Sequence, residues 1–167
     1  MNFFSKLRYI SRMVFKNTID IHSGAPGVIG RLSNFTKREF VFDGVSCRSI
    51  EGVLQSFKFE DIDKQSKICA LYGMRAKRAG LKKHEWKEDL ILYWQRKAYE
   101  RTREDYQLLL GRLYESVYAQ DEGFRRDIQR CRNRILVHSV GINDVTQTVL
   151  TETELCERLK KLSDKHR

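Results

Sequence analysis

The spacing of hydrophobic residues alternates along the chain between a period of two and a period of 3.6. Residues 18–22 alternate as in a short strand. Residues 39–47 hold two such runs on either side of Asp43-Gly44, which favours a hairpin because glycine accepts a positive φ angle. Residues 135–140 form another strand-like run. The pattern therefore predicts a few short strands, two of them paired in a hairpin.

Helical spacing begins after Ser49. The apolar residues of 50–57 fall on one stripe, and the Ser49 hydroxyl is placed to cap the helix N-terminus. Shorter helical patterns lie around residues 68–71 and over 86–97. Gly and Pro in residues 23–27 interrupt the first strand and predict a mobile loop before these helices.

The longest apolar stripe covers residues 106–118 and predicts a helix that packs in the core. A last helix is expected after Thr151, because Thr151 and Glu154 have the spacing of a capping box. The predicted fold class is α+β, predominantly helical, with a small hairpin and short strands. We expect an N-terminal basic arm over residues 1–17 and one compact domain over 18–167.

Composition narrows the class of protein. The chain has 167 residues, with 32 Lys and Arg against 22 Asp and Glu, a net charge of +10. A single proline excludes collagenous and Pro-rich classes, and no run approaches the roughly 18 apolar residues that a membrane span needs. We therefore expect a soluble protein without membrane partners. The alternative for the first 16 residues is a basic amphipathic helix that touches a membrane or a polyanion.

Four cysteines lie far apart without a CxxC pair, so neither a zinc ribbon nor a thioredoxin-like site is indicated. No histidine pattern suggests metal ligands or a catalytic triad. The N-terminal segment never builds the hydrophobic run of a signal peptide, which together with the cysteine spacing favours a cytoplasmic location. No metal and no cofactor are expected.

Basic residues are concentrated in two clusters that would raise the local concentration of phosphate-bearing partners. Nucleic acid or a nucleotide is the partner that such patches favour, and an ordinary solvated surface is the alternative. The clusters are Arg75/Lys77/Arg78/Lys82/Lys83 and Arg125/Arg126/Arg130/Arg132/Arg134.

A polar stripe runs beside the apolar face of the helix that follows Ser49. Glu51, Gln55 and Lys58 stand at i, i+4 and i+7, so a carboxylate, an amide and an ammonium would share one direction. Gly52 costs about 1 kcal/mol in helix propensity unless another group must approach closely. The stripe is either the wall of a pocket or ordinary helix surface.

Three segments carry a resemblance to a known family. Residues 32–35 read LSNF, residues 40–44 read FVFDG, and residues 49–59 fit S-x-E-x-x-x-Q-x-x-K-F. Their order and spacing resemble the NADAR/YbiA-like family, and AKRAG at 76–80 is similar to its AK-x-x-G segment. The similarity extends over about residues 18–162.

The resemblance implies hydrolysis of an N-glycosidic bond. YbiA-type members of the family cleave ribosylaminopyrimidine intermediates of riboflavin synthesis, and NADAR members remove ADP-ribose from guanine bases in DNA. Because +10 suits a polyanion, ADP-ribosylated DNA is the expected partner and another phosphorylated riboside is the alternative. A third hypothesis is an inactive protein that only binds ADP-ribose or nucleic acid.

The chemistry of that bond suggests roles for two residues of the stripe. A carboxylate stabilises the positive charge that builds on the sugar, and Glu51 fits this catalytic role. Lys58 is the second catalytic candidate, either as a nucleophile that attacks a ring-opened sugar or as a charge that binds phosphate. The alternative for Lys58 is an intrahelical partner without chemistry.

Substrate contacts follow from the remaining matched positions. We expect Asn34 to bind a ribose hydroxyl and Asp144 to orient water or bind the sugar diol, although both also suit local turns. Trp86 is the expected family tryptophan, with Trp94 as the alternative, and no tryptophan follows the segment around Asp144, where YbiA-like members carry a Trp-Gly pair. The other predicted substrate-binding residues are Ser33, Phe35 and Gln55.

Overall fold

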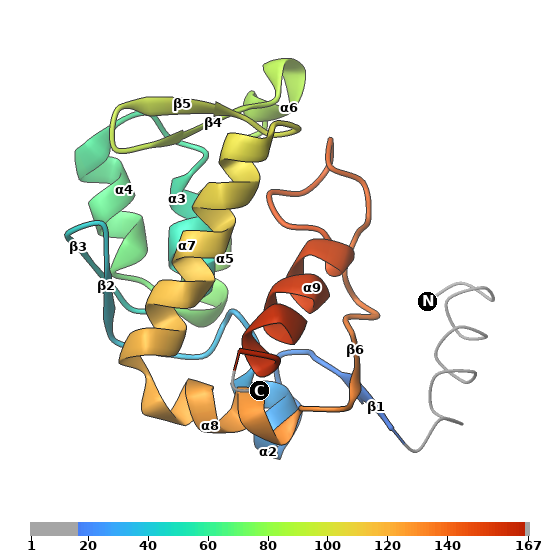
Figure 1. The fold of residues 1–167 in the computed structure, drawn as a ribbon. Coiled ribbons are helices and arrows are strands. Elements are labelled where there is room, and N and C mark those ends of the chain that lie inside the picture. Colours follow the sequence, from blue (N-terminus) through green and yellow to red (C-terminus); the bar gives the residue numbers. More distant parts are fainter. Residues whose placement is uncertain (1–16, 166–167) are drawn as a thin grey trace.

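The computed structural model describes residues 17–165, so the predicted basic arm lies outside the described residues apart from Asn17. The helices and strands alternate irregularly along the chain (Figure 1). In chain order they are β1 (Thr18–Asp20), α2 (Gly27–Arg31), β2 (Phe40–Phe42), β3 (Val45–Cys47), α3 (Ile50–Ser56), α4 (Ile62–Cys69), α5 (Gly73–Leu81), α6 (Trp86–Asp89), β4 (Ile91–Trp94), β5 (Lys97–Glu100), α7 (Glu104–Gln120), α8 (Glu122–Arg130), β6 (Ile135–Val137) and α9 (Glu152–Ser163).

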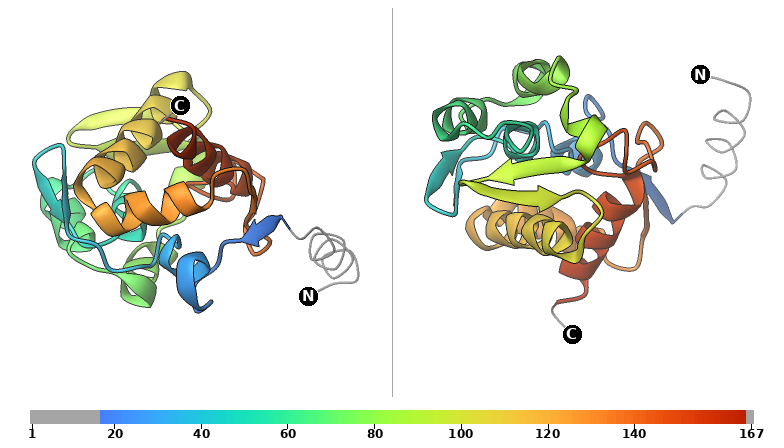
Figure 2. Two further views of the ribbon diagram at one scale, coloured as in Figure 1. Left: turned by 60° about the horizontal axis from the view of Figure 1, so that its bottom comes forward. Right: turned by 90° about the horizontal axis from the view of Figure 1, so that it is seen from above.

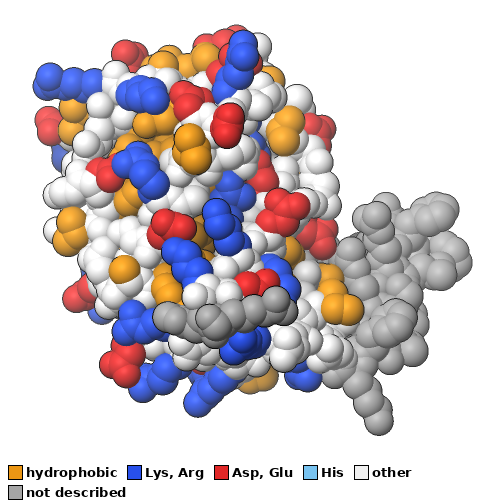
Figure 3. All heavy atoms as spheres, in the orientation of Figure 1, with side chains coloured by type: hydrophobic (Ala, Val, Ile, Leu, Met, Phe, Trp, Pro, Cys, Tyr) orange, Lys and Arg blue, Asp and Glu red, His pale blue; other side chains and the backbone are white. Residues whose placement is uncertain are grey.

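The helix α7 crosses the middle of the molecule, and the other helices surround it. In the views of Figures 1 and 2, α3, α4 and α5 lie on one side of α7, α9 lies on the other, and the β4–β5 hairpin covers one end. Over the face that α7 and α9 form, acidic and basic side chains are interspersed, and Lys and Arg become more numerous toward α8 (Figure 3). The predicted α+β class with mainly helical content is confirmed.

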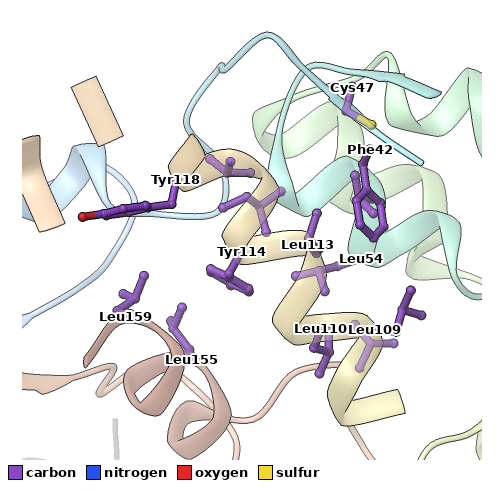
Figure 4. Close-up of a cluster of buried hydrophobic side chains, with 14 of the residues drawn as sticks. Phe42, Cys47, Leu54, Leu109, Leu110, Leu113, Tyr114, Tyr118, Leu155 and Leu159 are labelled. Atoms are coloured by element: carbon purple, nitrogen blue, oxygen red, sulfur yellow. The ribbon is translucent and has the colours of Figure 1, made fainter. Parts of the chain in front are cut away.

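The core is built on the apolar stripe of α7 that the 106–118 pattern predicts. Leu109, Leu113 and Tyr114 are buried, and α7 lies between Leu54 of α3 on one side and Leu155 of α9 on the other (Figure 4). Burying a large apolar side chain contributes about 1.5 to 3 kcal/mol, so this stripe holds the two sides together.

Each sheet has two strands. The hairpin β2–β3 turns at Asp43-Gly44, where both residues have positive φ angles, as the sequence predicts. The strands β1 and β6 pair in parallel, with Thr18 opposite Ile135 and Asp20 opposite Val137. This pairing joins the start of the described chain to the segment that leads into α9.

The helix predicted over residues 86–97 is wrong beyond its first turn. The helix α6 ends at Asp89, Leu90 adopts a left-handed φ of 58°, and β4 and β5 then form a second hairpin. The apolar residues there also fit a period of two: Leu92 and Trp94 point into the core, and the turn at Gln95-Arg96 uses two further positive φ angles. Packing against α3 decided between the two periods, because the backbone N–H of Tyr93 donates to the carbonyl of Phe57 at 2.7 Å.

The helix α2 replaces part of the region that the sequence predicts as a loop. Pro26 stands at the N-cap with an extended backbone, which suits proline because it has no N–H to donate. Gly30 is required within α2, since a Cβ there would lie 2.0 Å from the carbonyl oxygen of Ala25. The helical pattern around residues 68–71 falls at the end of α4, which stops at Cys69.

Both predicted helix caps are confirmed. The Ser49 hydroxyl accepts from the backbone N–H of Gly52 at 2.9 Å, and Thr151 and Glu154 make a complete capping box at α9. Gly52 also allows the close approach that its helix cost suggests, because a Cβ would lie 2.9 Å from the Ile68 carbonyl oxygen at the end of α4. The α3 helix is therefore fixed at its first turn by both a cap and a neighbouring helix.

A buried ion pair fixes the segment before α9. The guanidinium of Arg101 donates to both carboxylate oxygens of Glu154, at 2.8 and 2.6 Å, and to the carbonyl of Thr148 at 3.0 Å. The Tyr106 hydroxyl donates to the carbonyl of Val149 at 2.7 Å. Residues 148–151 are thereby held against β5 and α7.

Candidate functional site

A cavity of about 270 Å³ lies where α3 meets the segments that follow β1 and β6. Residues far apart in the sequence meet in it, because the β1–β6 pairing places the segments that follow these two strands side by side. Its lining residues are Ile21, Ser23, Ser33, Asn34, Phe35, Glu51, Leu54, Gln55, Lys77, His138, Val140, Gly141, Ile142, Thr148, Val149, Leu150, Thr151 and Leu155.

Glu51 places a carboxylate in this cavity. It stands in the first turn of α3, and only 5% of the residue is exposed. Its Oε1 accepts from Gln55 Nε2 at 2.9 Å and lies 3.5 Å from the ammonium of Lys77. A carboxylate held by one amide and one cation in a small cavity can stabilise positive charge that develops on a bound group.

Asn34 borders the carboxylate through both its backbone and its side chain. Its carbonyl accepts from the backbone N–H of Glu51 at 2.9 Å, and its Oδ1 accepts from the Tyr114 hydroxyl at 2.7 Å. Burial raises the pKa of Tyr114, so the hydroxyl keeps its proton as a donor. With Oδ1 engaged by Tyr114, the amide NH₂ of Asn34 is the group left to face a ligand.

Ser33 and Phe35, which the sequence predicts to bind substrate, also line the cavity. The Ser33 hydroxyl accepts from the backbone N–H of Phe35 at 3.2 Å, which makes a tight local turn. Phe35 in turn accepts through its carbonyl from the N–H of Gly73 at 3.0 Å. The LSNF segment is thus tied to α5 as well as to α3.

Gln55 is fully buried and supports Glu51 from one turn further along α3. Its Oε1 is buried without a hydrogen-bond partner among the described residues and faces Gly80 of α5. A Cβ at Gly80 would lie 2.2 Å from that oxygen. Glycine at position 80 is therefore what lets α5 approach the polar side of α3.

Lys77 is the ammonium group that the structure brings to Glu51. It projects from α5, half-buried, and lines the cavity. The sequence places Lys77 only in a basic cluster and in the segment similar to AK-x-x-G. The match of residues 76–80 to the AK-x-x-G segment is the signal that could have identified Lys77 as a candidate site residue.

Lys58 lies beyond the end of α3 and is not among the residues that line the cavity. Its Nζ donates to the carbonyl of Gly80 at 3.1 Å and lies 5.9 Å from the centre of the Trp86 ring. Burial, followed by the charge of Lys77, lowers the pKa of Lys58 to about 8, while Glu51 opposes this shift and Lys87 adds to it. The charges of Lys77 and Glu51 at the cavity therefore influence the pKa of Lys58, although the Lys58 ammonium itself is bound to the Gly80 carbonyl.

The sequence leaves two candidates for the family tryptophan, and the structure places them differently. Trp86 is buried beneath Lys58 and Lys87, and its indole N–H has no partner among the described residues. Trp94 donates its indole N–H to Asp43 at 2.8 Å and stacks on Phe42. Trp86 is thus the one next to a predicted site residue, although neither lines the cavity.

Asp144 lies outside the cavity, on the exposed loop after β6. Its Oδ1 accepts from the hydroxyl of Thr146 at 2.7 Å and from the backbone N–H of Thr146 at 2.9 Å, and these bonds lower the pKa of Asp144. This is the local turn that was the alternative for Asp144.

Residues after β6 contribute a wall that the sequence does not single out. His138 lines the cavity, and its ring Nδ1 is hydrogen-bonded to the carbonyl of Ile21. Val140 and Ile142 are 69% and 52% exposed and also line it. No spacing motif marks these residues, because they reach α3 only through the pairing of β6 with β1.

Within residues 17–165 no group of three or more His, Cys, Asp and Glu side chains is arranged to hold a metal ion. None of the four cysteines, all of which lie within the described residues, forms a disulfide. None of the described helices is both long and apolar enough to cross a bilayer.

Comparison with known proteins places the chain in a family. Residues 27–164 match the family described as Bacteriophage protein GP30.3. The chain belongs to this family. A relative from Enterobacteria phage T4, described as an uncharacterized 17.1 kDa protein in the Gp30-rIII intergenic region, is 31% identical over 135 residues, which are 80% of this chain and 88% of that protein.

The fold of this GP30.3-family chain is also that of a solved structure. The NMR structure of the Escherichia coli protein YbiA matches with a TM-score of 0.60 at 17% identity, over 89% of this chain and 84% of YbiA. The YbiA-like fold that the LSNF, FVFDG and S-x-E segments indicate is therefore confirmed.

Proposed function

We propose that this protein hydrolyses the N-glycosidic bond between ADP-ribose and a nucleobase, with guanine in ADP-ribosylated DNA as the substrate. The observation that carries the proposal is the buried carboxylate of Glu51, held in a small cavity by Gln55 and Lys77. The YbiA-like fold and the match to the NADAR/YbiA-like motifs support the same chemistry. The choice of DNA as the substrate rests on the net charge of +10.

The carboxylate acts where positive charge develops. As the bond between C1 of the ribose and the base nitrogen breaks, C1 gains oxocarbenium character, and Glu51 stabilises that charge. Water adds to C1, its proton leaves, and the base departs with the bonding electron pair and takes up a proton. The amide of Asn34 is placed to bind a ribose hydroxyl beside Glu51.

A covalent route would use an amine. The amine attacks C1 of the ring-opened sugar, the base leaves, and water hydrolyses the resulting imine to restore the amine and release the sugar aldehyde. A pKa of about 8 leaves about a tenth of Lys58 as the neutral amine near pH 7. Lys77 is the closer amine to Glu51, and Lys58 would have to leave Gly80 to reach the cavity.

The size of the cavity supports a riboside rather than the whole nucleotide. Ligand pockets generally measure about 300 to 1,000 Å³, so a cavity of about 270 Å³ suits the ribose and part of the base. The phosphates and the rest of the nucleic acid would lie outside it.

The competing function is YbiA-like cleavage of a phosphorylated intermediate of riboflavin synthesis, favoured by the likeness to YbiA. Salt dependence separates the two, because cleavage of a DNA-borne group falls steeply between about 50 and 200 mM salt and cleavage of a small riboside responds less.

The test is release of free ADP-ribose from ADP-ribosylated guanine DNA by the wild type, Glu51→Gln, Lys58→Ala and Lys77→Ala, with borohydride present to trap an enzyme adduct. Release that Glu51→Gln abolishes supports the glycosidase. An adduct lost in only one lysine variant identifies the nucleophile, and no adduct favours direct attack by water. No release from DNA or from the riboflavin intermediates would leave a binding protein.

A further inference from the structure

The two basic clusters of the sequence have similar numbers of acidic partners but lie in different places relative to the cavity. The helix α8 carries Arg126 and Arg130, which face Glu122 at 3.5 Å and Asp127 at 3.6 Å. Asp127 also binds Arg31 through both oxygens, at 2.6 and 2.8 Å. Arg126 and Arg130 therefore each contact an acid, while no acid among the described residues lies within salt-bridge distance of the other three arginines of this cluster. No residue of α8 lines the Glu51 cavity, whereas Lys77 of α5 does.

In the α5 cluster, Lys77 and Lys83 contact Glu51 and Glu85, and three cations keep no acidic partner within the described part of the chain. Residues 73–87 contain six Lys and Arg against one acid, Glu85. Arg75, Arg78 and Lys82 are exposed, and among the described residues no acidic group lies within salt-bridge distance of any of them. Unpaired surface cations of this kind attract phosphate groups, since no internal acid competes with the phosphate.

These three cations share one face of the helix. Arg75, Arg78 and Lys82 stand at i, i+3 and i+7, so they form a row along α5. Lys77 lies on the neighbouring side, toward Glu51. Since an α-helix is about 10 Å wide, the row lies within reach of a strand whose modified base enters the cavity.

The position of this row relative to Glu51 is fixed by packing. Gly80 of α5 abuts Gln55 of α3, and the Gly80 carbonyl accepts from Lys58. Figure 2 shows α5 at the outer side of the molecule beside α3, which leaves its far face open. Lys87 of α6 donates to Gln147 at 3.0 Å, so basic residues continue from α5 toward the loop after β6.

Apolar side chains are also exposed on α5 and at its N-cap. Met74 and Leu81 are 52% and 53% exposed, and the guanidinium of Arg48 lies 5.1 Å from the ring of Tyr72, at the N-cap of α5. Apolar and cationic groups side by side suit a nucleic acid, which offers sugars and bases as well as phosphates.

We propose that the outer face of α5, with Arg75, Arg78 and Lys82, binds the sugar–phosphate backbone of the DNA that carries the group cleaved in the Glu51 cavity. This assignment rests on the proposed function only for the group that is cleaved. The binding of DNA by α5 can be measured without any catalysis.

The experiment compares two triple variants of the full chain that lose the same charge. Arg75→Gln/Arg78→Gln/Lys82→Gln removes the α5 row, and Arg126→Gln/Arg130→Gln/Arg132→Gln removes three cations of the α8 cluster. Affinity for a fluorescein-labelled, unmodified DNA duplex is measured by anisotropy between about 50 and 200 mM salt. Each lost phosphate contact lowers the slope of log K against log salt by about 1.

The α5 variant should bind at least about 10-fold more weakly, with a slope smaller by about 2 to 3, while the α8 variant keeps the wild-type slope. Equal slopes for wild type and α5 variant, or a larger loss in the α8 variant, would overturn the assignment even if the wild type is an active glycosidase. On ADP-ribosylated DNA the α5 variant should raise KM and leave turnover of ADP-ribosylated guanosine unchanged. An inactive wild type that shows the α5-dependent slope would refute the proposed function and keep the DNA surface.

Discussion

Arg101 holds both carboxylate oxygens of Glu154 inside the protein, and this pair fixes the segment that closes one side of the Glu51 cavity. The guanidinium is fully buried, and its Nε also donates to the carbonyl of Thr148. Glu154 in turn caps α9 at Thr151. One ion pair thus connects β5, the cavity wall and the last helix.

Replacing Arg101 by Met should destabilise the protein by about 3 to 5 kcal/mol, because the carboxylate of Glu154 would be left buried without its cation. The matched control is Arg103→Met, since Arg103 pairs with Glu100 at 3.1 Å on the surface and such pairs contribute at most about 1 kcal/mol. Urea denaturation measures both changes. Similar losses in the two variants would contradict the role of the buried pair.

Acid should weaken the same contact. Burial by itself would raise the pKa of Glu154, but hydrogen bonds from Arg101 and the Thr151 backbone, with the charge of Arg101, lower it below 4.5. A lowered carboxyl pKa gives stability that is present above the unfolded value and is lost as the pH falls through the folded value. The stability difference between wild type and Glu154→Gln should therefore shrink below pH 4.5. A difference that stays constant on acidification would show that the charge is not the source.

The charged form of Lys58 should destabilise the folded protein, whereas the charged form of Glu154 stabilises it. Its pKa falls from 10.5 to about 8 on folding, chiefly through burial, so the unfolded chain binds more protons between these values and stability rises with pH across that window. Lys58→Met removes this penalty and should stabilise the protein near pH 7 by on the order of 2 kcal/mol. Thermal melts from pH 7 to 10.5 test this, and the rise in stability should be smaller in the variant than in the wild type. A variant that melts with the same pH dependence as the wild type would refute it.

Gly80→Ala should impair the site more than the fold. The new methyl would lie 2.2 Å from Gln55 Oε1, and the buried Gln55 side chain would have to turn away from Glu51. We expect at least a 10-fold loss of the proposed glycosidase activity. Gly111→Ala in α7 is the control, because no atom lies within 4 Å of its Cβ position and a helical alanine stabilises by about 0.5 to 1 kcal/mol. Full activity in Gly80→Ala would show that Gln55 does not support Glu51.

Several local features follow from the sequence because their causes are local. The Asp43-Gly44 hairpin depends on two positive φ angles, and the caps at Ser49 and Thr151 depend on side chains three residues from their targets. The polar side of α3 is equally local, so Glu51 and Gln55 are found together as predicted.

The helix predicted over 86–97 failed because a local period can be overridden by contacts with distant residues. The backbone N–H of Tyr93 donates to Phe57. Gln95 donates to Gln65 through its backbone and to Asp43 through its side chain. Strand pairing within β4–β5 then satisfied the backbone better than a continued helix.

The sequence by itself determined the fold class, the caps, the hairpin and the carboxylate of the candidate site, since each depends on residues within a few positions. Tertiary structure decided the rest. It ended α3 before Lys58, brought Lys77 to Glu51 across Gly80, and closed the cavity with residues around His138 through the parallel β1–β6 pair. These contacts join residues that are far apart in the chain, and only the packing of whole elements fixes which side chains meet.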